Sequence, residues 1–438
     1  MRNALTISGY FFATATQSAL AFFSVPLLVR GIGVAEFGRW SLIEPVAQLV
    51  AQCALLGLNQ GAIRLISHDG LTPWAAVRLI LRRIWPVLLL AGVGTAAATL
   101  AMDWLRPWAA WLLGLFVLLE AVLALFLSSL RAGNRVAAFA SGIVIRSAAI
   151  LALLSAAIFA GVPAIHSAEN VLGWWGLVWL LAAGLLAILI VREKGPPGSA
   201  AQEALHFQNA LRYGLPLLAT VLFAFVTQYA DRFLLSRFFN YEILGHYVIY
   251  LKIAAALNFL VLPVQLWWPS ARFQWVKRAD GGASLFPRAA LAGSALFLAA
   301  ALGVWAVSPW LIRWFAPGVA FDGDAIFLLA LAVALNGMAV FVNVGLLLPG
   351  RTHLNIPVSL IAAVSQIGLV SWLAPLYGVV GAALATVLTA LINLVLQAIF
   401  SQRCYPLPFR FGLMGALFVA VAMIAVATRG LVAGMALQ

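Results

Sequence analysis

The chain has 438 residues, of which 64% are apolar and 9% are charged. A soluble domain carries about 45–50% apolar and about 25% charged residues, so a soluble globular enzyme is excluded. The 26 Lys and Arg residues outnumber the 13 Asp and Glu residues, but they occur singly or in small groups between apolar stretches. This distribution is typical of topology signals in a membrane protein, and it argues against nucleic-acid binding.

Apolar runs long enough to cross a membrane follow one another along the whole chain. A spanning helix needs about 20 such residues, and the first run is too long for the core of a signal peptide. The runs are also much longer than the alternating strands of a membrane barrel, which predicts an all-α polytopic membrane protein. The thirteen predicted helices are residues 5–29, 40–63, 84–102, 108–130, 137–161, 171–191, 211–236, 245–269, 289–310, 325–349, 356–376, 379–400 and 410–428.

The positions of the cations predict the orientation of these helices. When the N-terminus is placed in the cytoplasm, most of the 26 Lys and Arg residues fall on the cytoplasmic side, as the positive-inside rule requires. We therefore expect a multi-pass protein of the cytoplasmic (inner) membrane with a cytoplasmic N-terminus. An odd number of helices then places the C-terminus outside.

A short sequence repeat relates the two halves of the chain. Residues 27–43 (LLVRGIGVAEFGRWSLI) and residues 234–250 (LLSRFFNYEILGHYVIY) share Leu, Leu, Arg and Gly at a shift of 207 residues. Both stretches lie at the turn between the first two helices of a half. Because the shift spans six helices, the two halves should have the same orientation, as in transporters built from parallel repeats.

The repeat and one polar linker predict the domain organisation. Gly-Pro-Pro-Gly-Ser at 195–199 lies between the sixth and seventh predicted helices, where two halves would be joined. The predicted parts are an N-terminal six-helix bundle (1–194), a cytoplasmic linker (195–210), a C-terminal six-helix bundle (211–402) and an additional C-terminal helix with a tail (403–438).

Three motifs resemble those of a known transporter family. They are the turn G-x-G-x-x-E-F-G (31–38), Leu-Gly-Leu-Asn-Gln (56–60), and Gly-Leu-Pro (214–216) followed by Gln-Tyr-Ala-Asp-Arg-Phe-Leu-Leu (228–235). The glycine-rich turn is not a nucleotide loop, since no strand precedes it. In these motifs, and in helix count and spacing over residues 5–400, the chain resembles the polysaccharide transporter (Wzx-type flippase) family. This family belongs to the multidrug/oligosaccharidyl-lipid/polysaccharide exporter superfamily.

This resemblance implies two six-helix bundles around a central cavity, lined mainly by the first, second, seventh and eighth helices. It also implies a flippase that moves a polyprenyl-diphosphate-linked oligosaccharide from the inner to the outer leaflet by alternating access, for surface polysaccharide such as the O-antigen of lipopolysaccharide. The expected partners are this lipid-linked glycan, membrane lipid and polysaccharide-assembly proteins, and the expected state is a monomer.

Ionisable residues inside predicted helices are costly and therefore need an explanation. Asp231 and Lys252 lie at nearly equal distance from the turn near Tyr241. Lys252 could bind the lipid diphosphate or acidic sugar groups, or it could form a structural ion pair with Asp231. Glu120 and Arg146 flank another turn symmetrically, and we expect them to form a static buried pair.

Other polar residues near the predicted cavity have two readings each. Glu44 is either a proton or sodium site or an interfacial carboxylate close to Arg30 or Arg39. Guanidinium groups bind phosphate oxygens in pairs, so some arginines are candidate diphosphate contacts as well as ordinary interface residues. Amides could bind sugar hydroxyls or join helices. The arginine candidates are Arg30, Arg64 and Arg237, and the amide candidates are Asn59, Gln60, Gln17 and Gln228.

Two other functions remain open. A cation-coupled multidrug exporter of the same superfamily would be expected to bury carboxylates in its N-terminal bundle, and the first predicted helix has none. A membrane-embedded glycosyltransferase or polymerase would need a catalytic group in a sizeable polar loop, which the outer loops do not provide. The five His residues and the two Cys residues (Cys53 and Cys404) are scattered, so we expect no cofactor, no metal site and no catalytic residues.

Overall fold

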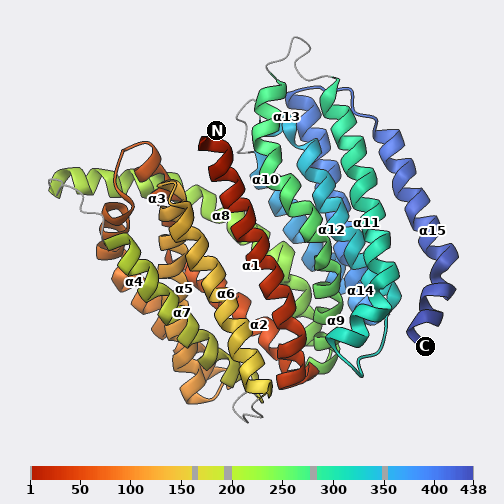
Figure 1. Cartoon of the computed structure of the whole chain (residues 1–438), viewed down its shortest axis with the longest axis horizontal. Coiled ribbons are helices and arrows are strands. Elements are labelled where there is room, and N and C mark those ends of the chain that lie inside the picture. Colours follow the sequence, from red (N-terminus) through yellow and green to blue (C-terminus); the bar gives the residue numbers. More distant parts are fainter. Residues whose placement is uncertain (1, 160–165, 192–199, 277–283, 348–353, 438) are drawn as a thin grey trace. The chain divides into compact units, whose positions relative to one another are not determined.

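The computed structural model describes residues 2–159, 166–191, 200–276, 284–347 and 354–437, and all regular structure in these ranges is helical. The elements in chain order (Figure 1) are α1 (Arg2–Ile32), α2 (Val34–Ala54), α3 (Leu58–Ser67), α4 (Pro73–Ala101), α5 (Pro107–Ala132), α6 (Val136–Phe159), α7 (Ala168–Val191), α8 (Ala200–Phe238), α9 (Tyr241–Ala254), η1 (Ala255–Leu257), α10 (Asn258–Trp275), α11 (Leu285–Phe315), α12 (Gly323–Val342), α13 (Val344–Leu347), α14 (Asn355–Cys404) and α15 (Phe411–Leu437).

The helices account for the predicted membrane crossings. Eleven helical segments among the described residues are long and apolar enough to span, and α2 with α3 forms a further span bent by 53°. The 50 residues of α14 would extend for about 75 Å at 1.5 Å per residue, roughly two membrane widths. The backbone of α14 breaks at Gly378 (φ 61°). Divided there, the spans correspond one to one with the thirteen predicted helices, and the all-α polytopic prediction is confirmed.

Local sequence signals set several helix ends. The side chains of Thr72, Asn240 and Asp322 each accept a hydrogen bond from a backbone N–H in the first turn of α4, α9 and α12. Such capping satisfies N–H groups that the helix leaves without a partner. The second span is broken because Leu56 and Gly57 both have positive φ, 51° and 74°, a conformation that glycine adopts without steric cost.

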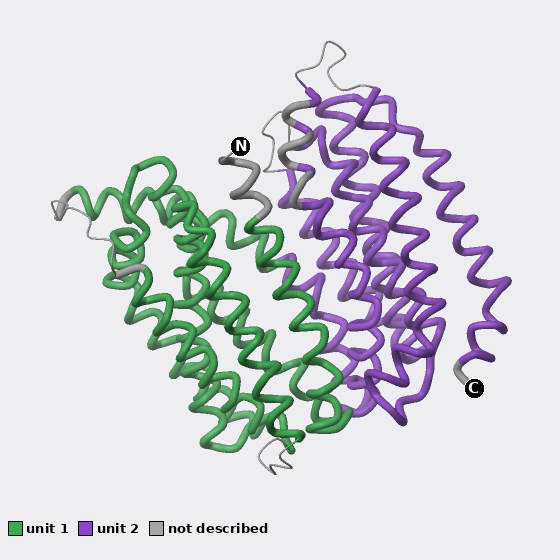
Figure 2. The backbone as a smooth tube through the Cα atoms, viewed as in Figure 1, with its two compact units in different colours: residues 1–222 green, residues 223–438 purple. Residues whose placement is uncertain are grey.

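The chain divides into two compact units, residues 1–222 and 223–438, shown in green and purple in Figure 2. The division falls within α8. Of the predicted linker, residues 195–199 lie outside the described ranges, and residues 200–210 form the first turns of α8. The limits predicted for the four parts of the chain remain a prediction.

Small residues and one carboxylate organise unit 1. A Cβ atom on Gly114 of α5 would lie 2.5 Å from the carbonyl oxygen of Gly92 on α4, so the two helices pack with their backbones close together. Glu169 of α7 pairs with Arg39 of α2 at 3.1 Å and with Arg106 at 3.5 Å. These contacts join the ends of α2, α5 and α7.

The first half of α8 packs against α3 within unit 1. A Cβ atom on Gly214 would lie 2.3 Å from the carbonyl oxygen of Gly57, and one on Gly57 would lie 2.1 Å from the carbonyl oxygen of Gly214. One turn further along α3, a Cβ atom on Gly61 would lie 2.7 Å from the carbonyl oxygen of Ala210, which is one turn before Gly214 on α8. This approach explains why the Gly-Leu-Pro motif and the Leu-Gly-Leu-Asn-Gln motif both contain glycine.

Aromatic side chains packed against glycines form the interior of unit 2. A Cβ atom on Gly293 of α11 would meet the Phe341 ring at 2.2 Å, and one on Gly337 of α12 would meet the Phe297 ring at 2.8 Å. The additional helix α15 lies against α11 (Figure 1), where Arg313 donates a hydrogen bond to the carbonyl oxygen of Met435 at 2.6 Å.

The structure also carries the predicted repeat. Helices α2 and α9 begin at Val34 and Tyr241, which are separated by the same 207 residues as the matching sequences. Arg30 and Arg237 lie in the last turns of α1 and α8, as repeat partners should. The halves differ further on, because α9 ends in the 3-10 turn η1, whereas α2 continues for about one more helical turn before it breaks.

Candidate functional site

A buried carboxylate marks the centre of unit 2. Asp231 of α8 is 2% exposed, and it accepts hydrogen bonds from the hydroxyl of Tyr247 on α9 and from the backbone N–H of Arg232 (2.8 Å). A neutral tyrosine donor thus satisfies Asp231, and a cation, Arg232, follows it directly in the sequence. The ion pair of Asp231 with Lys252 stays a prediction.

This cation is also buried. Arg232 is 6% exposed, and its guanidinium lies 4.7 Å from the centre of the Tyr229 ring. Its Nε atom is buried and has no hydrogen-bond partner among the described residues. A cation stacked on an aromatic face is stabilised by the ring quadrupole, but it keeps hydrogen-bonding capacity for a further group.

The cluster continues from Tyr247 into both halves of α14. Thr386 lies beside the Tyr247 hydroxyl, and the Gln366 side-chain amide donates a hydrogen bond to the Thr386 hydroxyl at 3.3 Å. Within the described part of the chain, the Gln366 Oε1 and Thr389 Oγ1 atoms are buried without a hydrogen-bond partner. A buried carboxylate at the end of such a chain of hydroxyl and amide groups can bind and release a proton.

The other predicted residues of unit 2 lie on the same two helices. Lys252 is half-buried in the last turn of α9. Gln228 is exposed on α8, three residues before Asp231, and Arg237 is exposed in the last turn of that helix. The structure thus keeps Asp231, Gln228 and Arg237 on α8 but does not bring them into one hydrogen-bonded group.

In unit 1, three of the predicted polar residues lie on α3, directly after the break between α2 and α3. The side-chain amide of Asn59 donates a hydrogen bond to Gln52 at 3.0 Å, and half-buried Gln60 follows Asn59 in the first turn of α3. The Arg64 guanidinium lies 5.6 Å from the centre of the Tyr213 ring. Asn59 thus joins α2 and α3 across their break, and Arg64 joins α3 to α8.

The remaining candidates of unit 1 lie on α1 and α2. Gln17 and Glu44 are half-buried on α1 and α2, and Arg30 is exposed at the end of α1. The expected neighbour Arg39 pairs with Glu169 instead. The sequence did not point to this pair because the two residues lie 130 positions apart on helices whose packing is tertiary.

The expected direct pair between Glu120 and Arg146 is not among the ion pairs of the described residues. Instead, both side chains contact Trp179 of α7. The Trp179 indole N–H donates a hydrogen bond to Glu120, and the Arg146 guanidinium lies 4.5 Å from the centre of the Trp179 ring. Glu120 and Arg146 are thus connected through the Trp179 side chain.

Sequence reasoning missed most of the cluster around Asp231. Tyr247 entered only as part of the repeat sequence 234–250, and Gln366 and Thr386 were not singled out. A usable signal exists, since these are uncharged polar side chains inside long apolar segments, where each needs a hydrogen-bond partner. No group of three or more His, Cys, Asp or Glu side chains in the described ranges could hold a metal ion.

Known proteins share this architecture. Among solved structures, the chain is similar to an inward-facing multidrug resistance MATE family transporter of the MOP superfamily, with 14% identity, a TM-score of 0.68, and coverage of 91% of this chain and 95% of that chain. It is also similar to the lipid II flippase MurJ in an inward closed conformation, with 14% identity, a TM-score of 0.63, and coverage of 96% and 92%. At these identities the likeness shows a common fold.

Sequence comparison identifies the family of the chain. A search of curated proteins finds no match. The family model described as "Polysaccharide biosynthesis protein" matches residues 6–269, which is more than half of the chain. This multi-pass membrane protein with a transporter fold therefore belongs to the polysaccharide biosynthesis protein family.

Proposed function

We propose that the protein is a flippase that moves a polyprenyl-diphosphate-linked oligosaccharide across the cytoplasmic membrane by alternating access. The glycan would be destined for a surface polysaccharide of the O-antigen or lipopolysaccharide type. The protein would work as a monomer with a cytoplasmic N-terminus, in contact with membrane lipid and polysaccharide-assembly proteins, and without catalysing a chemical reaction.

The observation that carries this proposal is the family match on a chain with a transporter fold. One solved structure of this fold is described as a lipid II flippase, which indicates that the fold can act on a lipid-linked molecule. A member of a polysaccharide biosynthesis family would then handle a lipid-linked glycan. The net charge of +13 suits an anionic diphosphate substrate.

Two residues would have distinct roles in transport. Lys252, half-buried near the end of α9, would attract the diphosphate. Asp231 would bind or release a proton as the protein changes conformation, because it is buried and accepts a hydrogen bond from Tyr247, whose hydroxyl lies beside Thr386. Glu44 would be a proton or sodium site. The further substrate contacts would be the arginines Arg30, Arg64 and Arg237 and the amides Asn59, Gln60, Gln17 and Gln228.

The alternative is a cation-coupled multidrug exporter, which the MATE-like structures favour. Such a protein would use a buried carboxylate to bind a cationic drug. Helix α1 contains no Asp or Glu, and Asp231 lies next to the buried cation Arg232. This neighbouring positive charge would repel a cationic drug, and we therefore favour the flippase.

Deletion of the gene followed by mass spectrometry of extracted lipids tests the proposal. We expect an undecaprenyl-type lipid-linked oligosaccharide to accumulate and surface glycan to fall. Complementation with Lys252→Ala or Asp231→Asn should restore the protein level but less than a tenth of surface glycan. Asp103→Asn, in the loop after α4, is the matched control and should restore both.

The two functions give different results in the same strain. Unchanged lipid-linked oligosaccharide together with increased sensitivity to cationic drugs would overturn the flippase in favour of the exporter. Full surface glycan in the Lys252→Ala strain would remove this lysine from the substrate site.

A further inference from the structure

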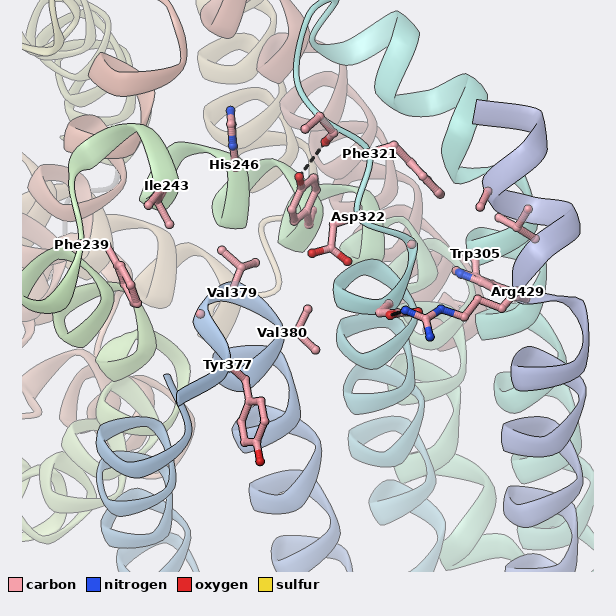
Figure 3. Close-up of a pocket in the computed structure, with 17 residues that line it drawn as sticks. Phe239, Ile243, His246, Trp305, Phe321, Asp322, Tyr377, Val379, Val380 and Arg429 are labelled. Carbon is pink, nitrogen blue, oxygen red and sulfur yellow. Dashed lines mark hydrogen bonds and ion pairs between the residues drawn. The ribbon is translucent and has the colours of Figure 1, made fainter. Parts of the chain in front are cut away.

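A second polar site lies within unit 2, at the end of the unit where α9 begins and α15 ends. The pocket there has a volume of about 550 Å³, within the range of about 300–1,000 Å³ for small-molecule sites. It is lined by residues of α9, α11, α12, α14 and α15 and by the loop between α11 and α12 (Figure 3). None of these residues belongs to the cluster around Asp231.

Two side-chain hydrogen bonds and one helix break shape the wall of the pocket. The Tyr250 hydroxyl donates a hydrogen bond to the carbonyl oxygen of Ala320 at 2.7 Å, which fixes the loop before α12. Asp322 caps α12 by accepting from the Ala325 N–H at 3.0 Å. The left-handed conformation of Gly378 breaks α14 beside the pocket. The pocket is therefore built by specific contacts rather than by loose packing.

The additional helix α15 completes the site. Arg429 of α15 binds Asp324 of α12 (Figure 3), and its side chain remains 67% exposed. Asp322 lies on the same side of the pocket (Figure 3). Two carboxylates and one guanidinium thus face a shared volume, with an excess of one negative charge.

Aromatic side chains form much of the rest of the wall. Tyr377 is 62% exposed at the break of α14, and Trp305 of α11 is 4% exposed. The Trp305 Nε1 atom is buried and has no hydrogen-bond partner in the described ranges. Figure 3 shows the nitrogen edge of this indole turned toward Arg429. A buried N–H group without an acceptor is costly, and a ligand oxygen would satisfy it.

These groups match the chemistry of a sugar ring. Its C–H faces pack on aromatic rings, its hydroxyls donate to carboxylates, and its ring and hydroxyl oxygens accept from indole and guanidinium groups. The excess negative charge disfavours phosphates and acidic sugars, because like charges in a shared site repel. An amino sugar would instead gain an ion pair with Asp322.

We propose that this pocket binds neutral or amino-sugar units of the glycan, and that α15 completes it. The proposal rests on the flippase function, and on the predicted orientation it places the site at the outer end of unit 2. The diphosphate would be excluded from this site, so that sugar and diphosphate are held at different places.

Binding of free trisaccharides to the purified full-length protein in lipid nanodiscs tests this. The probes are maltotriose (neutral), triglucosamine (cationic) and trigalacturonate (anionic), measured by saturation-transfer NMR titration. We expect the first two to bind and trigalacturonate to bind at least tenfold more weakly. The double variant Asp322→Asn/Asp324→Asn should reverse the preference between the charged probes, since it leaves Arg429 without an opposing charge.

A second variant changes the charge of the pocket in the opposite direction and should perturb folding less. Arg429→Gln changes an exposed side chain and should strengthen triglucosamine binding about tenfold. Asp103→Asn, which lies in unit 1, should change nothing. Binding of none of the three probes, or a charge preference that is the same in wild type and both variants, would overturn the proposal. Neither result bears on lipid-linked oligosaccharide accumulation, so the failure of the pocket and the failure of the flippase are distinguishable.

Discussion

Aromatic side chains donate hydrogen bonds to two carboxylates within helices, Asp231 and Glu120. Tyr247 donates to Asp231, and Trp179 donates to Glu120. A neutral donor satisfies a carboxylate in a low-dielectric environment without a second buried charge, whose desolvation costs several kcal/mol. Arg232 and Arg146 then lie over aromatic rings, where a cation is also stabilised.

Replacement of Trp179 by Phe should destabilise the protein. The change keeps an aromatic ring beneath Arg146 but removes the donor of Glu120, which leaves a partly buried acceptor without its partner. We expect a loss of about 1–3 kcal/mol in the free energy of unfolding, measured as a lower midpoint of thermal unfolding in detergent. Glu120→Gln should cost less, because the amide oxygen still accepts the indole hydrogen bond.

The control for lost indole volume is Trp175→Phe, one turn earlier on α7. Trp175 packs edge-on against Trp40 at 5.3 Å between ring centres. If both substitutions lower the midpoint equally, the hydrogen bond to Glu120 contributes nothing measurable.

At the scale of helices, the approach of α3 and the first half of α8 has almost no spare room. Gly57 and Gly214 each place a backbone carbonyl where the other would carry a Cβ atom. Backbone atoms can move less than flexible side chains can, so only glycine fits at both positions.

Gly214→Ala should therefore lower the amount of folded protein. Overpacking a tight contact costs about 1–3 kcal/mol, and here the clash is with backbone atoms. The measurement is the fraction of monodisperse protein after extraction in detergent. Gly184→Ala on α7, where a Cβ atom meets nothing within 4 Å, is the matched control and should behave as wild type. Equal yields for both variants would show that α3 and α8 separate without cost.

The same helix junction has an ionic part outside the membrane spans. Asp69, in the loop after α3, lies 2.8 Å from His68 Nδ1 and 3.2 Å from His206 Nδ1 on α8. Burial alone would raise the pKa of Asp69, but hydrogen bonds and the charges of both His side chains outweigh it and lower the pKa below its usual value. The ionised carboxylate is therefore favoured in the folded protein.

A lowered folded pKa contributes stability above the unfolded pKa of Asp, about 3.9, and that stability is lost as the pH falls through the folded pKa. Asp69→Asn should therefore lower the thermal midpoint at pH 7, and the gap from wild type should close below about pH 4. His206→Gln should lower the midpoint at pH 7 as well, since it removes one of the two partners. A gap that stays constant down to pH 3 would contradict this assignment.

At the scale of the whole chain, the number of spans decides where the two ends lie. We expect thirteen crossings, which would put the two ends on opposite sides of the membrane, and the positive-inside rule predicts a cytoplasmic N-terminus. A green fluorescent protein fusion should fluoresce at the N-terminus and not at the C-terminus. Alkaline phosphatase fused after residue 438 should be active. The same fusion after residue 404, before α15, should be inactive, and activity there would reverse the topology.

The sequence alone determined the helical membrane fold, the thirteen segments and the repeat around Arg30 and Arg237. These follow from local hydrophobicity and from the cost of an unsatisfied backbone in lipid, which depend on neighbours along the chain. The partners of the buried charges were decided by tertiary packing. Glu120 could not be assigned to Trp179, nor Asp231 to Tyr247, because opposite charge and equal depth do not specify which faces of two helices meet.

Tertiary packing also determined the pocket that α15 completes. Asp324 and Arg429 lie 105 residues apart, and neither was singled out from the sequence. Two breaks in regular structure, before α12 and at Gly378, lie beside these residues. Hydrophobicity determines that each segment becomes a helix, but side-chain packing between helices determines which polar residues come to share a site.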